Sequence, residues 1–218
     1  MVRSNLDRYQ RIAAFYDLLD LPFEYGRYRE LRPLLFRSLS GRILDAGVGT
    51  ARNLPFYPLG ADVVGIDIST AMLEGAERRR RSCTANVQLR QMDVTRLQFP
   101  DRTFDAAVAT LLFCVLPDDL QVPGLKEMGR VVKVGGIIRL LEYTRPRGMI
   151  RYAITRMCEP WVRWAYGASF DRRTEEHVAE AGLELLETHH VVDDLLKLSV
   201  LKTPSVGFAI AGESEHDC

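Results

Sequence analysis

A glycine-rich turn and two acidic residues are the part of this 218-residue chain best suited to chemistry. The turn, DAGVGTARN, runs from Asp45 to Asn53 and begins as the apolar run 42–46 ends. Glycines in such a turn let the backbone approach a ligand more closely than side chains would allow. Asp67 ends the next apolar run, 62–67, roughly 20 residues further on, where a carboxylate can accept hydrogen bonds from both hydroxyls of a ribose. These residues therefore predict a nucleoside-containing ligand that lies across the ends of two strands.

The turn differs from the dinucleotide fingerprint GxGxxG, whose third glycine allows close helix packing beside a pyrophosphate. Arg52 occupies the position of that glycine. Asp45, just before the first glycine, also fits poorly beside a pyrophosphate, because both groups are negative. It suits a ligand with an ammonium group and a sulfonium centre. The sequence therefore argues against an NAD-dependent oxidoreductase, and a purely structural turn is the remaining alternative.

Short apolar runs alternate with helical stretches, a pattern that indicates an α/β fold with parallel strands and crossover helices. We expect a Rossmann-like, doubly wound, mostly parallel seven-stranded sheet. The expected strands are 42–46, 62–67, 87–92, 104–110, 137–142, 183–191 and 196–201. The expected helices lie within the first forty residues, from Ser69 to about Arg81, at about 120–132, over 148–166 and from Thr174 to Gly182. Pro160 is expected to break the stretch 148–166 into two pieces.

The same pattern divides the chain into three parts. Residues 1–40 are expected to form an N-terminal helical cap, and residues 41–203 the Rossmann-like domain. Within that domain, about 146–170 is expected to be a lid insertion after the fifth strand. Residues 204–218, rich in Ser, Gly and acidic side chains, are expected to form a flexible tail.

Composition argues against several classes of protein. Lys and Arg total 29, as do Asp and Glu, so the net charge of zero gives no reason to expect nucleic acid as a partner. The four cysteines form no CxxC pair or zinc pattern, which suits a reducing compartment and predicts no metal. No run reaches the roughly 20 apolar residues that a transmembrane helix needs, and the N-terminus lacks the apolar core of a signal peptide. We expect a cytoplasmic protein, with peripheral membrane contact as the alternative.

Four ordered motifs within residues 40–143 resemble those of class I S-adenosylmethionine-dependent methyltransferases. The segment 44–53, LDAGVGTARN, is similar to the glycine motif of that family, and 64–69, VGIDIS, to its acidic motif. The segment 91–105 resembles the motif beside the adenine, and 125–136 the helix and turn before the fifth strand. The resemblance implies an enzyme that uses S-adenosyl-L-methionine as its cofactor.

The resemblance also implies roles for matching positions. The backbone around Gly47 and Gly49 would contact the methionine portion, and Asp45 would help to bind its amino group. Asp67 would hold the ribose hydroxyls, and Asp93 would accept from the adenine amino group; a turn cap is the alternative for Asp93. The complete expected cofactor-binding set is Asp45, Ala46, Gly47, Gly49, Asn53, Asp67, Ile68, Met72, Met92, Asp93, Val94, Thr110, Leu111, Tyr16 and Arg27.

The N-terminal stretch 16–27 resembles the entry segment of bacterial phospholipid N-methyltransferases and of quinone-biosynthesis C-methyltransferases. The resemblance implies that this segment covers the cofactor, and packing at a helix junction is the alternative. Methyl transfer is an in-line displacement in which positioning supplies much of the catalysis, so no fixed catalytic triad is expected. The catalytic candidates are Tyr16, Tyr25, Glu142 and His189, each with a structural role as the alternative.

The stretch 146–166 is unusual because it interleaves two tryptophans and four arginines with a single acid, Glu159. Such a helix suits a membrane interface or an apolar acceptor, and a lid helix with solvated arginines is the alternative. The expected function is methyl transfer to a small amphipathic or lipid acceptor, with a phospholipid amine headgroup favoured. A quinone precursor is one alternative acceptor. A small thiol is another, since 53–58 resembles thiol methyltransferases. A non-catalytic S-adenosylmethionine-binding protein, or one that uses this cofactor for other chemistry, is the alternative of another class.

Overall fold

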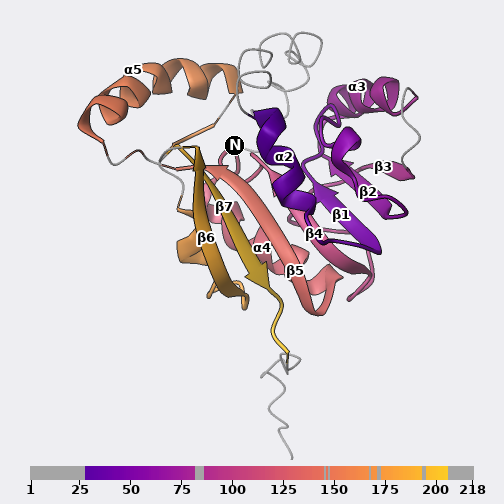
Figure 1. Cartoon of the computed structure of the whole chain (residues 1–218). Helices are drawn as coiled ribbons and strands as arrows, with labels where there is room; N and C mark the ends of the chain where they lie inside the picture. The colour runs from indigo at the N-terminus through magenta and orange to yellow at the C-terminus, as the bar shows by residue number, and fades with distance from the viewer. Residues whose placement is uncertain are drawn as a thin grey trace, which may run out of the picture.

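The computed structural model describes residues 28–81, 86–144, 146, 148–166, 168–170, 173–192 and 195–205. Figure 1 shows the elements in chain order. They are α2 (Arg29–Phe36), β1 (Arg42–Ala46), η2 (Leu54–Phe56), β2 (Asp62–Asp67), α3 (Thr70–Arg80), β3 (Val87–Gln91), β4 (Phe104–Thr110), α4 (Asp118–Val131), β5 (Val132–Tyr143), α5 (Met149–Tyr166), η3 (Thr174–His177), β6 (Glu184–Val192) and β7 (Leu196–Lys202). No helix in these ranges is long and apolar enough to cross a bilayer.

The seven strands form one sheet in the order β3-β2-β1-β4-β5-β7-β6. All neighbouring strands run parallel except β7, which is antiparallel to both β5 and β6. The short connection from β6 to β7 accounts for this exception, because a parallel crossover needs a dozen or more residues. The predicted Rossmann-like, mostly parallel seven-stranded sheet is confirmed.

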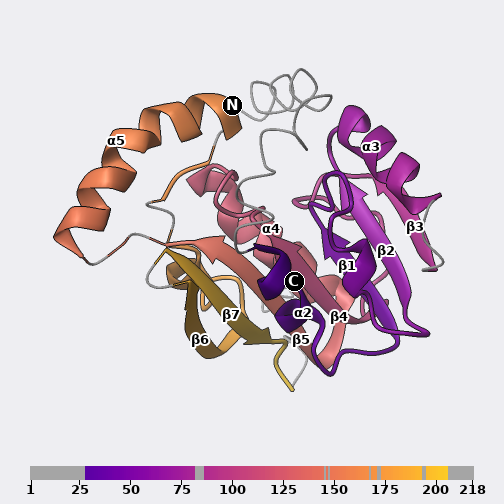
Figure 2. The same cartoon turned by 45° about the horizontal axis from the view of Figure 1, so that its top comes forward.

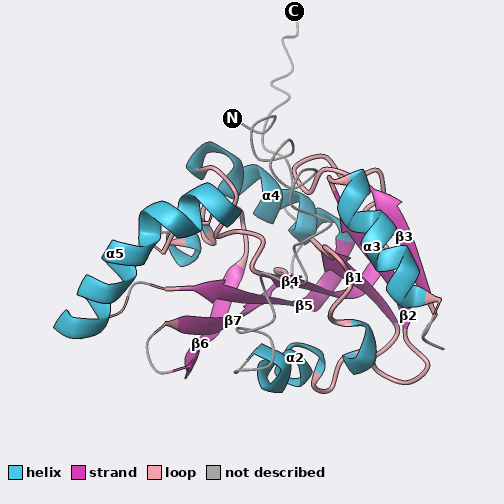
Figure 3. Ribbon diagram, turned by 90° about the horizontal axis from the view of Figure 1, so that it is seen from above, coloured by secondary structure: helices cyan, strands magenta, loops and turns pink. Residues whose placement is uncertain are grey.

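Helices cover both faces of the sheet (Figure 3). On one face, Leu125 and Met128 of α4 are fully buried in a cluster with Leu44, Val64 and other strand residues. On the opposite face, α2 and α3 pack over the residues that alternate with these. Their clusters contain Leu35 of α2 with Val108 and Leu141, and Ala76 of α3 with Ile43 and Val63. This alternation along each strand is the pattern of a sheet buried on both sides.

The strands β1, β2 and β4 end at one edge of the sheet. Ala46 is aligned with Ile66 of β2 and with Ala109 of β4, so the residues that follow all three strands meet there. The strand order also reverses between β1 and β4, because the chain passes from β1 outward to β3 and then returns to β4. Ligands of doubly wound sheets bind in the crevice at such a switch point. Figure 2 brings this edge forward.

Several predicted boundaries differ from the structure. The fifth strand begins at Val132, because Gly135 (φ +72°) and Gly136 lie within it instead of in a turn before it. The stretch after Thr174 forms only a short 3-10 helix. Pro160 lies inside a continuous α5, so the prediction of two pieces is wrong. A proline removes one helical hydrogen bond, and a helix can bend around that position without ending.

Candidate functional site

A cavity opens at the carboxyl ends of β1, β2 and β4. The segments that follow these strands and β3 line it, together with Arg32 of α2 and Met72 of α3. Eleven of the residues predicted to bind the cofactor are in this lining: Gly47, Gly49, Asn53, Asp67, Ile68, Met72, Met92, Asp93, Val94, Thr110 and Leu111. The motifs that lie apart in the sequence therefore meet around one space.

The two glycines of the turn serve different purposes. Both have positive φ, +71° at Gly47 and +54° at Gly49, where other residues are strained. A Cβ at Gly47 would lie 2.9 Å from the Leu112 Cδ1 atom, so this glycine allows close packing of the protein on itself. A Cβ at Gly49 would meet nothing within 4 Å, because Gly49 faces open space in the cavity. Gly49 is therefore the position at which a ligand can approach the backbone.

The carboxylate of Asp67 is held at the end of β2 by two backbone groups. Its Oδ2 accepts a hydrogen bond from the Gly49 N–H at 2.9 Å, and its Oδ1 accepts one from the Ser69 N–H at 2.8 Å. Ser69 also caps α3, since its Oγ accepts from the Met72 N–H at 3.3 Å. Burial raises the pKa of Asp67, and its backbone hydrogen bonds oppose this shift. The result is an oriented, desolvated carboxylate whose remaining lone pairs can accept from hydroxyl groups of a ligand.

Asp45 lies beneath the cavity and does not line it. Its side chain is completely buried, and its Oδ2 accepts from the Asn53 Nδ2 at 2.9 Å and from the Tyr57 hydroxyl at 2.7 Å. Burial raises the pKa of Asp45 to about 6, an effect that these two hydrogen bonds partly offset. Its Oδ1 has no hydrogen-bond partner among the described residues. Asp45 therefore acts on the cavity through Asn53, and Ala46 is likewise buried and outside the lining.

Asn53 connects three elements around the cavity. Its Oδ1 accepts from the Arg32 guanidinium of α2 at 2.6 Å, and its Nδ2 donates to the Thr110 Oγ1 at 3.1 Å as well as to Asp45. Asn53 and Arg32 are 3% and 5% exposed, so this network is shielded from solvent. Hydrogen bonds in such an environment fix side-chain positions well. The network holds α2, the glycine turn and the end of β4 in one arrangement.

Asp93 caps a turn and also lines the cavity. Its Oδ1 accepts from the Thr95 N–H and the Thr95 Oγ1, each at 2.8 Å, which is a turn cap. Asp93 also lines the cavity between Met92 and Val94. Because the cap uses Oδ1, Asp93 Oδ2 is the oxygen that remains for a ligand.

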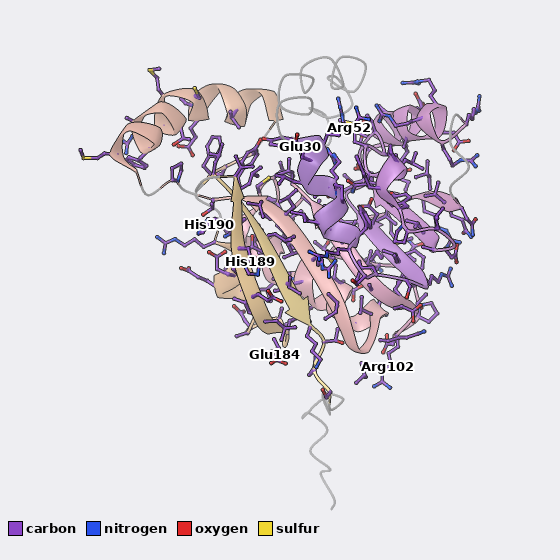
Figure 4. The ribbon with its side chains drawn as sticks, in the orientation of Figure 1. Glu30, Arg52, Arg102, Glu184, His189 and His190 are labelled. Atoms are coloured by element: carbon purple, nitrogen blue, oxygen red, sulfur yellow. The ribbon has the colours of Figure 1, made fainter. Side chains whose placement is uncertain are left out.

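Sequence reasoning missed half of the lining. The missed residues are Arg32, Val48, Thr50, Arg52, Ile66, Leu112, Val115, Leu116, Pro117 and Leu120. Arg32 stands among the leucines of α2, and an arginine on an apolar helix face was the available signal. Leu112, Val115 and Leu116 belong to an apolar run after β4, and an apolar run alone does not distinguish a cavity wall from core. Figure 4 shows Arg52 at the same edge of the molecule as Glu30 of α2.

Glu142 and His189, the two catalytic candidates among the described residues, do not line this cavity. Glu142 is 2% exposed and accepts from the Phe113 and Cys114 N–H groups at 3.0 and 2.8 Å, so it holds backbone instead of facing a ligand. His189 is exposed on the edge strand β6, where its Nε2 lies 2.5 Å from a Glu187 oxygen (Figure 4). Two strands, β5 and β7, separate β6 from β4. Tyr16, Tyr25 and Arg27 lie outside the described residues.

The lining fits S-adenosylmethionine. Gly49 provides open backbone, Asp67 and Asp93 present carboxylates at the ends of adjacent strands, and Met72 adds apolar surface. The unpartnered buried Asp45 Oδ1 provides negative charge close to the turn. Such groups suit a ligand that combines a chain able to approach the backbone, ribose hydroxyls, an aromatic amine with an apolar ring face, and a cationic centre.

Comparisons with known proteins agree with this fit. Residues 43–136 match a family model described as a methyltransferase domain. A phosphatidylethanolamine N-methyltransferase of Cereibacter sphaeroides is 35% identical over 153 residues, which cover 67% of this chain and 72% of that protein. The ubiquinone/menaquinone biosynthesis C-methyltransferase of Syntrophotalea carbinolica is 34% identical over 146 residues, 63% of this chain and 60% of that protein.

Solved structures share the fold. A possible histamine N-methyltransferase of Thermotoga maritima, described as S-adenosylmethionine-dependent, superposes with a TM-score of 0.66 at 19% identity over 89% of this chain and 99% of that one. The [4+2]-cyclase SpnF superposes with a TM-score of 0.63 at 19% identity over 82% of this chain and 80% of that one. At such identities the likeness concerns the fold alone. The motifs, the lining and the sequence relatives together place this chain in the family of S-adenosylmethionine-dependent methyltransferases.

Proposed function

We propose that this enzyme methylates the amine of a phospholipid headgroup. S-adenosylmethionine supplies an electrophilic methyl group bound to a sulfonium sulfur. A lipid amine nitrogen would form the new carbon–nitrogen bond as the sulfur–methyl bond breaks, and the amine would lose one proton. Catalysis of such an in-line displacement depends mainly on how the two reactants are held.

On the cofactor side, each lining residue would contact a different part of S-adenosylmethionine. Asp67 accepts from the ribose hydroxyls, and Asp93 Oδ2 accepts from the adenine amino group. The open backbone at Gly49 faces the methionine portion, and Thr110 at the end of β4 lies on the side of the transferring methyl. The hydrogen bonds that fix Asp67 and Thr110 support this assignment, because they orient both side chains toward the cavity lining.

On the acceptor side, the lining combines apolar surface with positive charge. Leu112, Val115 and Leu116 form an apolar wall, and Arg32 and Arg52 are among the residues of the same lining. A zwitterionic lipid headgroup carries an anionic phosphodiester beside its amine, and guanidinium groups recognise phosphate well. This combination supports an amphipathic acceptor over a purely polar one.

The observation that carries the lipid proposal is the exposed face of α5. Met149 is 87% and Met157 78% exposed, and Ala153 between them is exposed as well. Residues four apart share one helix face, so these three form an apolar stripe, with exposed Arg156 beside it. Figures 1 and 2 show α5 standing clear of the sheet at the edge where the cavity opens. An apolar stripe with a basic flank suits a helix that lies on an anionic membrane surface.

The test is to incubate the enzyme with S-adenosylmethionine that carries a deuterated methyl group and three acceptors in separate reactions. These are vesicles containing phosphatidylethanolamine, a demethylated menaquinone in detergent, and a small alkyl thiol. Mass spectrometry then locates the label. The proposal expects labelled N-methylated lipid and little label elsewhere, and labelled quinone or thiol without labelled lipid would contradict it.

A quinone precursor is the second candidate acceptor. The relative from Syntrophotalea carbinolica supports it, and the apolar wall would also accommodate an isoprenoid-bearing ring. Release of methylthioadenosine in place of a methylated product would indicate different chemistry on the same cofactor. Cofactor binding with no product from any acceptor would favour a non-catalytic binding protein.

A further inference from the structure

The segment after β4 forms one wall of the cavity, yet it belongs to no helix or strand. It runs from Leu111 to Pro117, and five of its seven residues line the cavity. Two turn hydrogen bonds hold its middle, from the Val115 and Leu116 N–H groups to the Leu112 and Phe113 carbonyl oxygens, and groups outside the segment hold the rest of its backbone. The groups that hold it therefore decide the shape of the site.

Glu142, near the end of β5, makes the most specific of these contacts. Its Oε1 accepts from the Phe113 N–H at 3.0 Å, and its Oε2 accepts from the Cys114 N–H at 2.8 Å. The side chain is 2% exposed, so water does not compete for either bond. Only an ionised carboxylate offers two equivalent acceptor oxygens to two successive N–H groups.

Neutral groups complete the attachment. The Gln121 Nε2 donates to the carbonyl oxygens of Phe113 at 2.7 Å and Leu116 at 3.1 Å, and the Ser169 N–H donates to that of Cys114 at 3.0 Å. At the start of the segment, Leu111 has a φ of +55°, a strained value for a leucine. Strained backbone persists where the surrounding structure fixes it. The Leu111 N–H donates to the Leu141 carbonyl oxygen at 2.8 Å, and the charge-assisted hydrogen bonds that Glu142 accepts fix the two residues at 113 and 114.

We propose that Glu142 is a positioning residue for methyl transfer, whose carboxylate holds the segment 111–117 as the wall of the cofactor cavity without touching either substrate. The inference rests on the proposed cofactor site. It differs from the catalytic role that the sequence suggested for Glu142, since the side chain faces backbone and lies outside the cavity lining.

The surroundings of Glu142 make this role sensitive to pH. Lys197 is its direct partner across β5 and β7, is 3% exposed, and pairs with Glu175 of η3. His190 follows on β6 in register with Lys197, and the Cys114 thiol lies against the carboxylate. Burial raises the pKa of Glu142 to about 7, and the two N–H groups and Lys197 partly offset that effect. Glu142 therefore gains a proton as pH falls through about 7.

Protonation of Glu142 has opposite effects on the geometry of the site and on the stability of the fold. A raised pKa means that the folded protein binds this proton more tightly than the unfolded chain does, so protonation of Glu142 favours folding as pH falls. A protonated carboxyl group, however, keeps only one good acceptor oxygen for two N–H donors. Acidification thus loosens the wall while Glu142 contributes more, not less, to the free energy of unfolding.

The experiment is calorimetric titration with S-adenosylhomocysteine between pH 8.5 and 6.5. The wild type is expected to lose about threefold in affinity at pH 6.5, because roughly three quarters of the protein then has Glu142 protonated and binds about tenfold more weakly. Glu142→Gln presents an NH2 group to one N–H donor, so its affinity is expected to be roughly tenfold lower at pH 8.5 and flat across this range. Glu187→Gln on exposed β6 is the matched control and should behave as wild type.

If the affinity of the wild type for S-adenosylhomocysteine does not change between pH 8.5 and 6.5, the proposal is overturned. This result needs no variant, so the proposal remains testable even if Glu142→Gln folds poorly. A pH slope that persists in Glu142→Gln would assign the titration to another carboxylate and also overturn it. Absence of S-adenosylhomocysteine binding to the wild type at every pH would instead refute the cofactor site on which the inference rests.

Discussion

At the scale of single residues, Gly49 and Asp67 show how little side-chain chemistry the cofactor site needs. Gly49 gives its N–H to Asp67 and leaves the opposite side of its backbone open to the cavity. Asp67 in turn accepts from Ser69 at the start of α3. The same few atoms therefore close the turn, cap the next helix and orient the carboxylate.

Gly49→Ala is expected to weaken S-adenosylhomocysteine binding by at least about tenfold, because a methyl group would occupy the space where the ligand approaches the backbone. The strain of alanine at positive φ costs roughly 1 kcal/mol of stability. Gly60→Ala is the matched control, since Gly60 has φ +76°, no atom within 4 Å of a built Cβ, and a position outside the cavity lining. Titration and thermal unfolding of both variants test the prediction, and equal binding by the two would refute it.

Asp45 gives a prediction about stability. Burial raises its pKa to about 6, so its ionised form penalises the folded state, and this penalty appears as pH rises through 6. In Asp45→Asn, the amide oxygen can still accept from Asn53 and Tyr57, and no charge is buried. We expect the free energy of unfolding to increase by about 2 kcal/mol at pH 8 and to change little at pH 4. Urea denaturation at both values checks this, and a loss of stability at pH 8 would contradict it.

At the scale of elements, the sequence predicted those parts whose cause is local. The bounds of β1, β2 and β4 agree with the predictions, because each is a short apolar run that ends beside a turn. Ser69 caps α3 as its residue type suggests. Eleven cavity residues followed from the resemblance of the local motifs to those of the methyltransferase family.

Parts that depend on distant contacts were beyond sequence reasoning. The apolar run 111–117 reads as core, and its place in the cavity wall comes from Glu142, nearly thirty residues later in the chain. Arg32 lines the cavity only because α2 packs over β4 and β5. Neither contact can be predicted from the spacing of residues along the chain.

The helix α5 gives a prediction at this scale. Met149→Asp combined with Met157→Asp should reduce flotation with anionic phosphatidylglycerol vesicles at low salt by roughly tenfold or more, because two exposed apolar side chains would no longer enter the lipid. Leu59→Asp, which changes a fully exposed leucine in the loop before β2, is the control and should float as wild type does. Wild-type protein that stays unbound to these vesicles would sink the membrane role of α5.

At the scale of the whole molecule, one edge of the sheet brings the two reactants together. The cofactor motifs after β1, β2 and β3 lie on one side of the switch point, and the apolar wall after β4 lies on the other. The helix α5 stands at the same edge (Figure 2). The opposite edge, where the strands begin, contributes no residue to the described lining. This division between a supporting edge and a reactive edge is what the doubly wound topology imposes.

The central claim is that S-adenosylmethionine binds at this edge with Asp67 as a principal contact. The most direct test is calorimetric titration of wild type, Asp67→Ala and Asp62→Ala with S-adenosylmethionine, with NAD as a control ligand. Asp62 begins the strand that Asp67 ends, so its variant changes the same residue type at the opposite edge. We expect tight binding of S-adenosylmethionine to wild type and Asp62→Ala, a loss of roughly tenfold to a hundredfold in Asp67→Ala, and no binding of NAD. Equal affinity in all three proteins, or preference for NAD, would contradict the account.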